Sequence, residues 1–211
     1  MDNEPLQKTD FGSIYDQADP RAYYTTLAEH AYEIPQHGAD VFRALQRERG
    51  HAGTSTMLDL CCSYGVVGAL MTTDFTFQQL TEHYRDHEKR GTSSEELLEV
   101  DRQLLQTHRR ADAPRVIGLD IAQNAIAYAT ASGALDRGFA VDLESADPTQ
   151  ALADELAGVD LITTTGGSGY VTEWTFKRLL DTSVKQRRYC CAASLLQGCE
   201  SGCELAPRGK G

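Results

Sequence analysis

Four short apolar runs, with helical patterns between the later ones, constrain the fold of this chain more than any other feature. Each run is rich in β-forming residues or continuously apolar, as expected for strands that are covered on both faces. The runs span residues 57–60, 115–119, 139–143 and 159–165. Between them, the segments AQNAIAYATASGAL and PTQALADELAG predict helices. This alternation predicts an α/β fold with a doubly wound, Rossmann-like sheet.

The connection after the first run is longer than one crossover helix requires. Residues 76–89 and 93–110 predict two helices with Gly91 between them, and Ser93 with Glu96 has the spacing of a capping box. We therefore expect a helical insertion at about residues 72–112. The histidines of this insertion are expected to be solvated, because no further ligand accompanies them at metal-binding spacing. They are His83, His87 and His108.

The two ends of the chain differ from this alternating part. Residues 20–49 predict two amphipathic helices, broken by a turn at 35–38, that form an N-terminal helical cap. Residues 1–181 are expected to form the domain, and residues 182–211 a divergent tail. The tail has five Lys or Arg and two Asp or Glu, a local charge of +3, so the rest carries −14. Residues 189–196 have its one strand pattern, so we expect an incomplete C-terminal part of the sheet.

Composition limits the partners of the chain. Its 211 residues, 41% of them hydrophobic, fit one globular domain. The formal net charge of −11 repels polyanions, so we expect no nucleic-acid partner. The sequence has no run of about 18 apolar residues and no signal-peptide pattern, so we expect no membrane partner and a cytoplasmic location.

The six cysteines are expected to be free thiols in such a location. Four of them lie in the tail, and their spacing lacks paired Cys-x-x-Cys knuckles and a histidine. We therefore expect no metal site there. The four are Cys190, Cys191, Cys199 and Cys203.

The turn after the first run has the sequence LDLCCSYGVVGAL, from residue 58 to residue 70. Ligands of open α/β sheets bind at the carboxyl ends of the strands, where this turn has to allow close approach of the backbone. A glycine fingerprint normally supplies small residues there. Cys61 and Ser63 stand at two of the glycine positions, and we expect Cys61 and Cys62 to be small packing residues rather than redox groups.

Asp59-Leu60-Cys61-Cys62-Ser63-Tyr64-Gly65 resembles the first motif of class I S-adenosylmethionine-dependent methyltransferases, acidic-x-Gly-x-Gly-x-Gly. Three later segments resemble further motifs of that family in the same order. They are residues 116–121, with an acidic residue at the end of the second run, residues 140–144 and residues 159–163. The resemblance covers roughly residues 57–180 and implies S-adenosylmethionine as the cofactor.

The resemblance also implies a role for each residue of the cofactor site. Asp59 would hold the α-ammonium group, and Asp120 would accept hydrogen bonds from the ribose hydroxyls. Asp142 would accept from the adenine amine. The alternative is that these three aspartates are strand-end caps or N-caps of helices. Ile121 would pack on the adenine ring, and the Leu143 backbone would donate a hydrogen bond to it. The full set of expected cofactor-binding residues is Asp59, Cys61, Ser63, Tyr64, Gly65, Asp120, Ile121, Asp142, Leu143 and Thr164.

The fourth run ends in a small, hydroxyl-rich loop, residues 163–170, where the acceptor is expected to bind. Tyr170 and Thr165 are the predicted catalytic residues, with a mobile turn and a packed tyrosine as the alternative. The loop lacks the Asn/Asp-Pro-Pro-Tyr signature of many amino methyltransferases, so we expect a small-molecule acceptor. Tyr15, Tyr23 and Tyr24 are lid candidates, although aromatic residues in a leading helix most often pack.

Three functions follow from this site. The first is methyl transfer to a small molecule by direct displacement, in which the enzyme mainly aligns the reacting groups. The second is cleavage or cyclisation of S-adenosylmethionine that releases methylthioadenosine. The third is a non-catalytic binding or regulatory protein with the same fold. The sequence predicts no oligomeric state.

Overall fold

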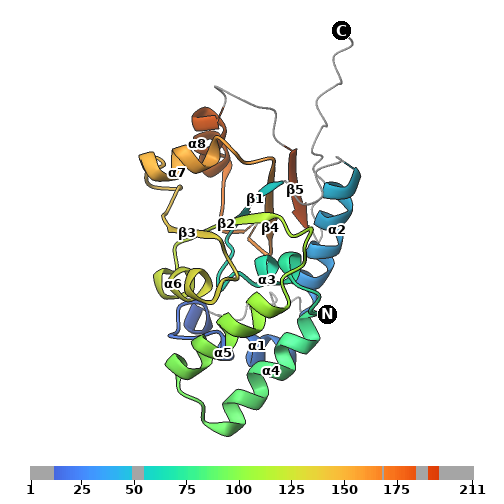
Figure 1. Ribbon diagram of the computed structural model, residues 1–211. Coiled ribbons are helices and arrows are strands. Elements are labelled where there is room, and N and C mark those ends of the chain that lie inside the picture. Colours follow the sequence, from blue (N-terminus) through green and yellow to red (C-terminus); the bar gives the residue numbers. More distant parts are fainter. Residues whose placement is uncertain (1–11, 49–54, 168, 184–189, 195–211) are drawn as a thin grey trace, which may run out of the picture.

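Five parallel strands form the centre of the molecule (Figure 1). The structure is a computed structural model that describes residues 12–48, 55–167, 169–183 and 190–194. The strands lie in the order β3-β2-β1-β4-β5. Their bounds are β1 Thr56–Leu60, β2 Arg115–Asp120, β3 Arg137–Ala140, β4 Leu161–Thr165 and β5 Cys190–Ser194. The predicted α/β class with a parallel sheet is confirmed.

Helices cover both sides of the sheet, because alternate strand residues face opposite sides. Met57 packs in one core with residues of α2, α3 and α6, whereas Leu58 packs in the other with α7 and α8. In Figure 1, α2 lies to the right of the sheet, and α7 and α8 lie at its upper left. Burial on both sides explains why the strands read as continuous apolar runs. The helices are α2 Ile34–Glu48, α3 Val66–Thr72, α6 Gln123–Ser132, α7 Gln150–Leu156 and α8 Glu173–Ser183.

Three further helices pack together at the lower end of the molecule in Figure 1. They are α1 Arg21–Glu29, α4 Phe77–Arg90 and α5 Ser94–Thr107, and a short 3-10 turn, η1 Gly12–Ile14, precedes α1. Tyr24 of α1 stacks on Tyr84 of α4, with ring centroids 4.4 Å apart. Tyr23 and Tyr24 are both buried, so they pack in the core rather than form a lid.

Capping boxes start α4 and α5, two of the three helices in the long connection between β1 and β2. The Ser93 side chain accepts from the Glu96 N–H, as the spacing predicts, and Thr76 with Gln79 forms a second box that the sequence analysis missed. Gly91 ends α4 in a left-handed conformation with φ 66°. Two of the predicted helices therefore begin and end within a few residues of the expected positions.

The predicted turn at residues 35–38 is wrong, because α2 begins at Ile34 and includes them. Pro35 is tolerated there because the first turn of a helix leaves its N–H groups without intrahelical partners. The break between the two leading helices lies instead between Glu29 and Ile34, where Ala31 has a φ of 50°. Pro35 therefore marks the start of a helix and not a break between two helices.

The third strand also differs from its prediction, since it spans 137–140 rather than 139–143. Its last paired residue, Ala140, lies opposite the last residue of β2, Asp120. The Asp142 carboxylate then accepts from the Glu144 N–H at 2.9 Å and from the Ser145 hydroxyl at 2.7 Å. This local turn competes with further strand pairing.

β5 extends the sheet beyond the first domain that the sequence predicts. It pairs with β4 from Leu161 opposite Cys190 to Thr165 opposite Ser194. The strand pattern is confirmed for residues 190–194, which belong to the same sheet as β4. The expected divergent tail is residues 182–211, of which 182 and 183 belong to α8 and 190–194 form β5, while 184–189 and 195–211 lie outside the described residues. The expectation that no further strand completes the sheet concerns residues 195–211.

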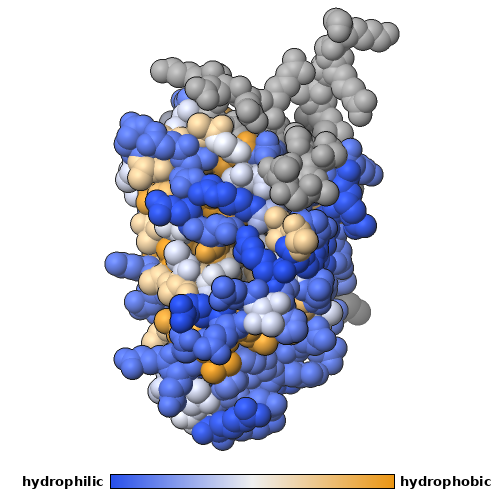
Figure 2. Space-filling model, in the orientation of Figure 1, coloured by the Kyte–Doolittle hydropathy of each residue, from blue (hydrophilic) through white to orange (hydrophobic). Residues whose placement is uncertain are grey.

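The visible surface is mostly hydrophilic, with small apolar patches between the polar side chains (Figure 2). Among the helices that the structure describes, none is long and apolar enough to cross a membrane.

Candidate cofactor site

The candidate site lies at the carboxyl ends of β1, β2 and β4, where the strand order reverses. From β1 the chain adds β2 and β3 on one side and then returns to add β4 and β5 on the other. Ligands of such sheets bind in the crevice outside this switch point. The loops after β1 and β4 touch here, because a Cβ on Gly167 would lie 2.7 Å from the Cβ of Cys61.

The loop after β1 has an alternating left-handed backbone. The φ angles of Cys61, Ser63 and Gly65 are 56°, 49° and 69°. A left-handed conformation costs an L-residue roughly 1–2 kcal/mol, and glycine avoids most of that cost. Cys61 and Ser63 therefore occupy backbone positions that favour glycine, as the motif comparison predicts. Strain of this kind persists where surrounding contacts hold it.

Asp120, at the end of β2, supplies one of those contacts. Its Oδ2 accepts a hydrogen bond from the Ser63 N–H at 2.8 Å, and its Oδ1 accepts from the Ala122 N–H at 3.0 Å. The second bond agrees with the capping alternative, because Ala122 is the N-cap of α6. A carboxylate offers about four lone-pair sites, so Asp120 retains acceptor capacity for a ligand hydroxyl.

Asp59 is a fully buried acidic residue within β1. Its Oδ1 accepts from the Thr163 hydroxyl at 3.2 Å. Burial raises the pKa of Asp59 to about 7, and the negative charge of Asp120 adds to the increase, while the Thr163 hydrogen bond opposes it. A positively charged partner beside Asp59 would favour its ionised form.

Three buried polar atoms of this region have no hydrogen-bond partner among the described residues. They are Asp59 Oδ2, Ser63 Oγ and Thr164 Oγ1. Thr164 lies opposite Leu60 in the pairing of β1 with β4, so all three atoms belong to the edge formed by β1, its loop and β4. A buried polar group without a partner costs about 1–3 kcal/mol. A bound ligand with polar groups would remove that cost.

Tyrosines from separate segments lie around the same edge. The Tyr32 hydroxyl would be 2.7 Å from a Cβ on Gly166, which follows β4 directly. Burial raises the pKa of Tyr32 to about 12, with smaller contributions from Tyr15 and Tyr170. The pKa of Tyr15 is raised by burial first and then by Tyr170 and Asp120. Tyr15, Tyr32 and Tyr170 are thus electrostatic neighbours.

The two predicted catalytic residues are Thr165 and Tyr170, and Tyr170 belongs to this group of tyrosines. Thr165 is the last residue of β4 and is partly buried. Tyr170 is 62% exposed, and its N–H donates to the Gly167 carbonyl at 2.9 Å. Thr165 thus ends the strand, and Tyr170 lies in the following loop, whose Gly167 contacts Cys61.

The Tyr64 side chain anchors the N-terminal segment. Its buried hydroxyl accepts from the Gln17 N–H at 2.6 Å and donates to the Gln17 carbonyl at 3.1 Å. Nearby, Asp16 Oδ1 accepts from the Asn124 N–H at 2.7 Å and so caps α6. The sequence analysis missed Asp16, because its partner lies 108 residues away and no local pattern signals the contact.

The remaining expected cofactor residues differ in exposure. Ile121 is 73% exposed directly after Asp120, which leaves an apolar side chain open to a flat ligand. Asp142 is exposed and forms the local turn described above. The Leu143 side chain is buried in the core beside α7 and α8, and its carbonyl accepts from Arg178.

Glu144 connects the loop after β3 to the start of α8, a role that the sequence analysis did not predict. Its carboxylate accepts from the N–H of Thr172 at 2.8 Å and from the hydroxyls of Thr172 and Thr175. These hydrogen bonds lower the pKa of Glu144 to about 2. The loop that carries Asp142 is thereby tied to the loop that carries Tyr170.

The two cysteines of the motif remain thiols at neutral pH. Burial raises the pKa of Cys61 to about 12, with added effects from Asp120, Asp59 and Glu144. Cys62 is buried, and burial raises its pKa as well. The described residues contain no cluster of metal-binding side chains. Cys199 and Cys203 lie outside the described residues, and Cys190 and Cys191 belong to β5.

The expectation of solvated histidines is wrong for His83. Its Nε2 lies 2.7 Å from Oδ1 of the buried Asp101, and its side chain is 18% exposed. Asp101 also accepts from the hydroxyls of Tyr84 and Tyr128, each at 2.8 Å. Tertiary packing of α4, α5 and α6 creates this network, which spacing within one helix does not reveal.

A scan against protein-family models and searches of curated proteins and of solved structures found no match to this chain.

Proposed function

We propose that the chain binds S-adenosylmethionine at the carboxyl edge of β1, β2 and β4 and transfers its methyl group to a small-molecule acceptor. The observation that carries this proposal is the set of buried, unpartnered polar atoms on Asp59, Ser63 and Thr164. They lie in and beside a loop whose backbone has glycine-like angles at alternate residues. Such a loop favours close approach of a ligand to the backbone.

The charges of the site support a ligand with a cationic group and hydroxyls. Asp59 gains an ionic partner if an ammonium group binds beside Oδ2, and an opposite charge favours its ionised form. Asp120 retains lone pairs for ribose hydroxyls after its two backbone hydrogen bonds. Ile121 offers an exposed apolar side chain for the adenine ring. Asp142 and the Leu143 backbone are proposed for the adenine edge.

The raised pKa values of Cys61 and Tyr32 favour an acceptor that needs no deprotonation by these two groups. When bound, S-adenosylmethionine supplies an electrophilic methyl group. Cys61 and Tyr32 both have a pKa raised to about 12, so they are hydrogen-bond donors rather than bases at neutral pH. Tyr170 and Thr165 are proposed to orient the acceptor, because direct displacement depends mainly on alignment.

Isothermal titration calorimetry with S-adenosylmethionine tests the binding step. We expect saturable binding, and the absence of binding by the folded chain would contradict the proposal. Mass analysis after incubation with small amines, phenols and thiols then tests the reaction. S-adenosylhomocysteine with a methylated acceptor supports methyl transfer. Methylthioadenosine indicates cleavage instead, and binding without either product indicates a non-catalytic protein.

A further inference from the structure

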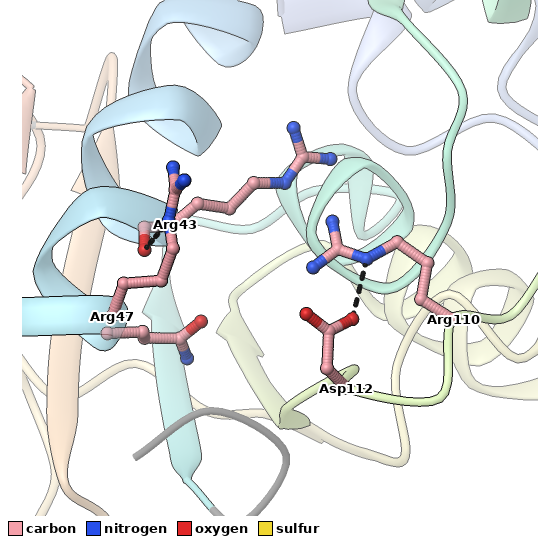
Figure 3. A pocket seen from close by; sticks show the side chains of 5 residues that line it. Arg43, Arg47, Arg110 and Asp112 are labelled. Atoms are coloured by element: carbon pink, nitrogen blue, oxygen red, sulfur yellow. Dashed lines mark hydrogen bonds and ion pairs between the residues drawn. The ribbon is translucent and has the colours of Figure 1, made fainter. Parts of the chain in front are cut away.

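A polar pocket lies at the opposite end of the sheet from the candidate cofactor site (Figure 3). Its volume is about 190 Å³. Gln46, at one wall, donates to the Ser55 hydroxyl at 2.7 Å, just before β1 begins. The residues of the other wall precede β2. The lining residues are Arg43, Gln46, Arg47, Arg110 and Asp112.

Positive charge dominates this pocket although the chain as a whole is acidic. Arg110 pairs with Asp112 at 2.9 Å, and Arg43 lies 3.4 Å from Asp40. Three guanidinium groups thus face two close carboxylates, and Arg47 has no ion pair among the described residues. Figure 3 shows Arg110 pointing across the pocket toward α2, the helix that carries Arg43 and Arg47.

The neighbouring positive charges act on Arg43 in addition to its burial. Burial lowers the pKa of Arg43 first, and the charge of Arg110 lowers it next. Asp40 and Asp74 oppose the decrease, and Arg47 adds to it. A bound anion would offset the effect of Arg110 and Arg47, since opposite charge favours the protonated guanidinium.

Several donors of the pocket are unused. Arg43 Nε is buried and has no hydrogen-bond partner in the described part of the chain. Arg47 Nε donates back to the Arg43 carbonyl at 3.2 Å, and Arg110 Nε donates to Asp112. No hydrogen bond to a described residue uses the terminal nitrogens of Arg47 or Arg110. These nitrogens are available to a ligand.

Arg43 also has a structural role, which accounts for only part of the cluster. Its Nη2 donates to the carbonyls of Leu70 and Thr73 at the end of α3. Those carbonyls would otherwise lack helical partners. This role explains neither the unpartnered Nε of Arg43 nor the positions of Arg47 and Arg110.

We propose that this pocket binds the phosphoryl group of a small molecule. Guanidinium groups present paired N–H donors that match phosphate oxygens, and charge-assisted hydrogen bonds of this kind are strong. About 10–15 Å³ of such cavity volume holds one water, so about 190 Å³ leaves room for a phosphoryl group. The site is separate from the proposed methyl-transfer site and does not depend on it.

Titration with inorganic phosphate, at an ionic strength held constant with chloride, tests the proposal by melting temperature and calorimetry. The double variant Arg47→Gln/Arg110→Gln removes two donors and leaves Arg43 in place to cap α3. Arg102→Gln is the matched control, because Arg102 pairs with Glu99 on the exposed face of α5. We expect saturable stabilisation of the wild type and the control, and an affinity about tenfold or more weaker in the double variant.

Two results of the phosphate titration would overturn the proposal. One is a wild type that phosphate stabilises no more than chloride does. The other is equal phosphate affinity in all three proteins, which would place the ion elsewhere. Circular dichroism without phosphate verifies that the double variant is folded. The same titration with acetate tests the kind of anion that binds. Stabilisation by acetate as strong as that by phosphate would identify a carboxylate site instead.

Discussion

The Ser63 N–H donates to Asp120 Oδ2 at 2.8 Å and joins the loop after β1 to the end of β2. Ser63 has a φ of 49°, so this bond holds a conformation that an L-residue otherwise disfavours. The carboxylate proposed to bind the ribose therefore also shapes the loop proposed to surround the amino acid portion. The two halves of the candidate site depend on one side chain.

Replacement of this side chain is expected to weaken the binding of S-adenosylmethionine. Asp120→Ala should cost about 2–3 kcal/mol of binding free energy, because charge-assisted hydrogen bonds are lost and Ser63 loses its anchor. Asp120→Asn keeps one acceptor oxygen and should lose less. Calorimetry measures both affinities, and urea unfolding verifies that each variant is folded. An unchanged affinity of Asp120→Ala would exclude this site.

Asp59 is expected to make the stability of the protein fall as pH rises. Its folded pKa of about 7 lies above the ordinary aspartate value of 3.8, so the folded state holds a proton that the unfolded state has released. Stability from this group is lost between about pH 4 and pH 7. The free energy of unfolding of Asp59→Asn, relative to that of the wild type, should therefore increase across that pH range. Urea unfolding at several pH values measures it, and a constant difference would contradict the assignment.

The same Asp59→Asn variant should bind S-adenosylmethionine more weakly, because the amide carries no charge for the ammonium group. A gain in stability together with a loss of affinity distinguishes a ligand-binding carboxylate from a structural one. The measurement is calorimetry above neutral pH, where Asp59 of the wild type is ionised.

Two opposite substitutions in the loop after β1 test its backbone strain. Ser63→Gly relieves the left-handed conformation and removes an unpartnered hydroxyl, so the free energy of unfolding should rise by up to about 1 kcal/mol. Gly65→Ala should lower it by about 1–2 kcal/mol, because φ is 69° and the new Cβ would lie 3.0 Å from the Ala134 Cβ. Ser63→Ala separates the two causes, since it removes only the hydroxyl. Urea unfolding reports all three values.

The buried network around Asp101 is expected to stabilise the helical layer. Asp101→Ala leaves the hydroxyls of Tyr84 and Tyr128 and the ring of His83 without their acceptor, and should cost about 3 kcal/mol. Tyr128→Phe removes one of these donors and should cost only about 1 kcal/mol. Equal losses in the two variants would show that the carboxylate is not the centre of the network.

Cys61 is expected to react slowly with iodoacetamide at neutral pH. Its pKa of about 12 leaves very little thiolate, which is the reactive form. In a Cys62→Ala background, mass analysis of the peptide that contains Cys61 measures its modification. Cys61 should react faster in protein that urea has unfolded, because unfolding removes the burial that raises its pKa. Equal rates would show that Cys61 is not protected.

Features that depend on local pattern could be predicted from the amino-acid sequence. Apolar runs located the strands, because a sheet covered on both sides requires them, and Ser93 with Glu96 located the start of α5. The order of acidic and small residues along the strands located a candidate site at the carboxyl edge. The backbone angles of Cys61 and Ser63 agree with the glycine positions of the motif.

The tertiary structure alone shows which groups meet across long stretches of chain. It brought Asp16 to the start of α6, Tyr64 to the N-terminal segment and His83 to Asp101, each a contact between residues whose own neighbours in sequence give no sign of it. It also showed which polar atoms of the site are buried without partners. Burial and hydrogen-bond satisfaction arise from all surrounding elements at once, so a pattern along one segment does not determine them.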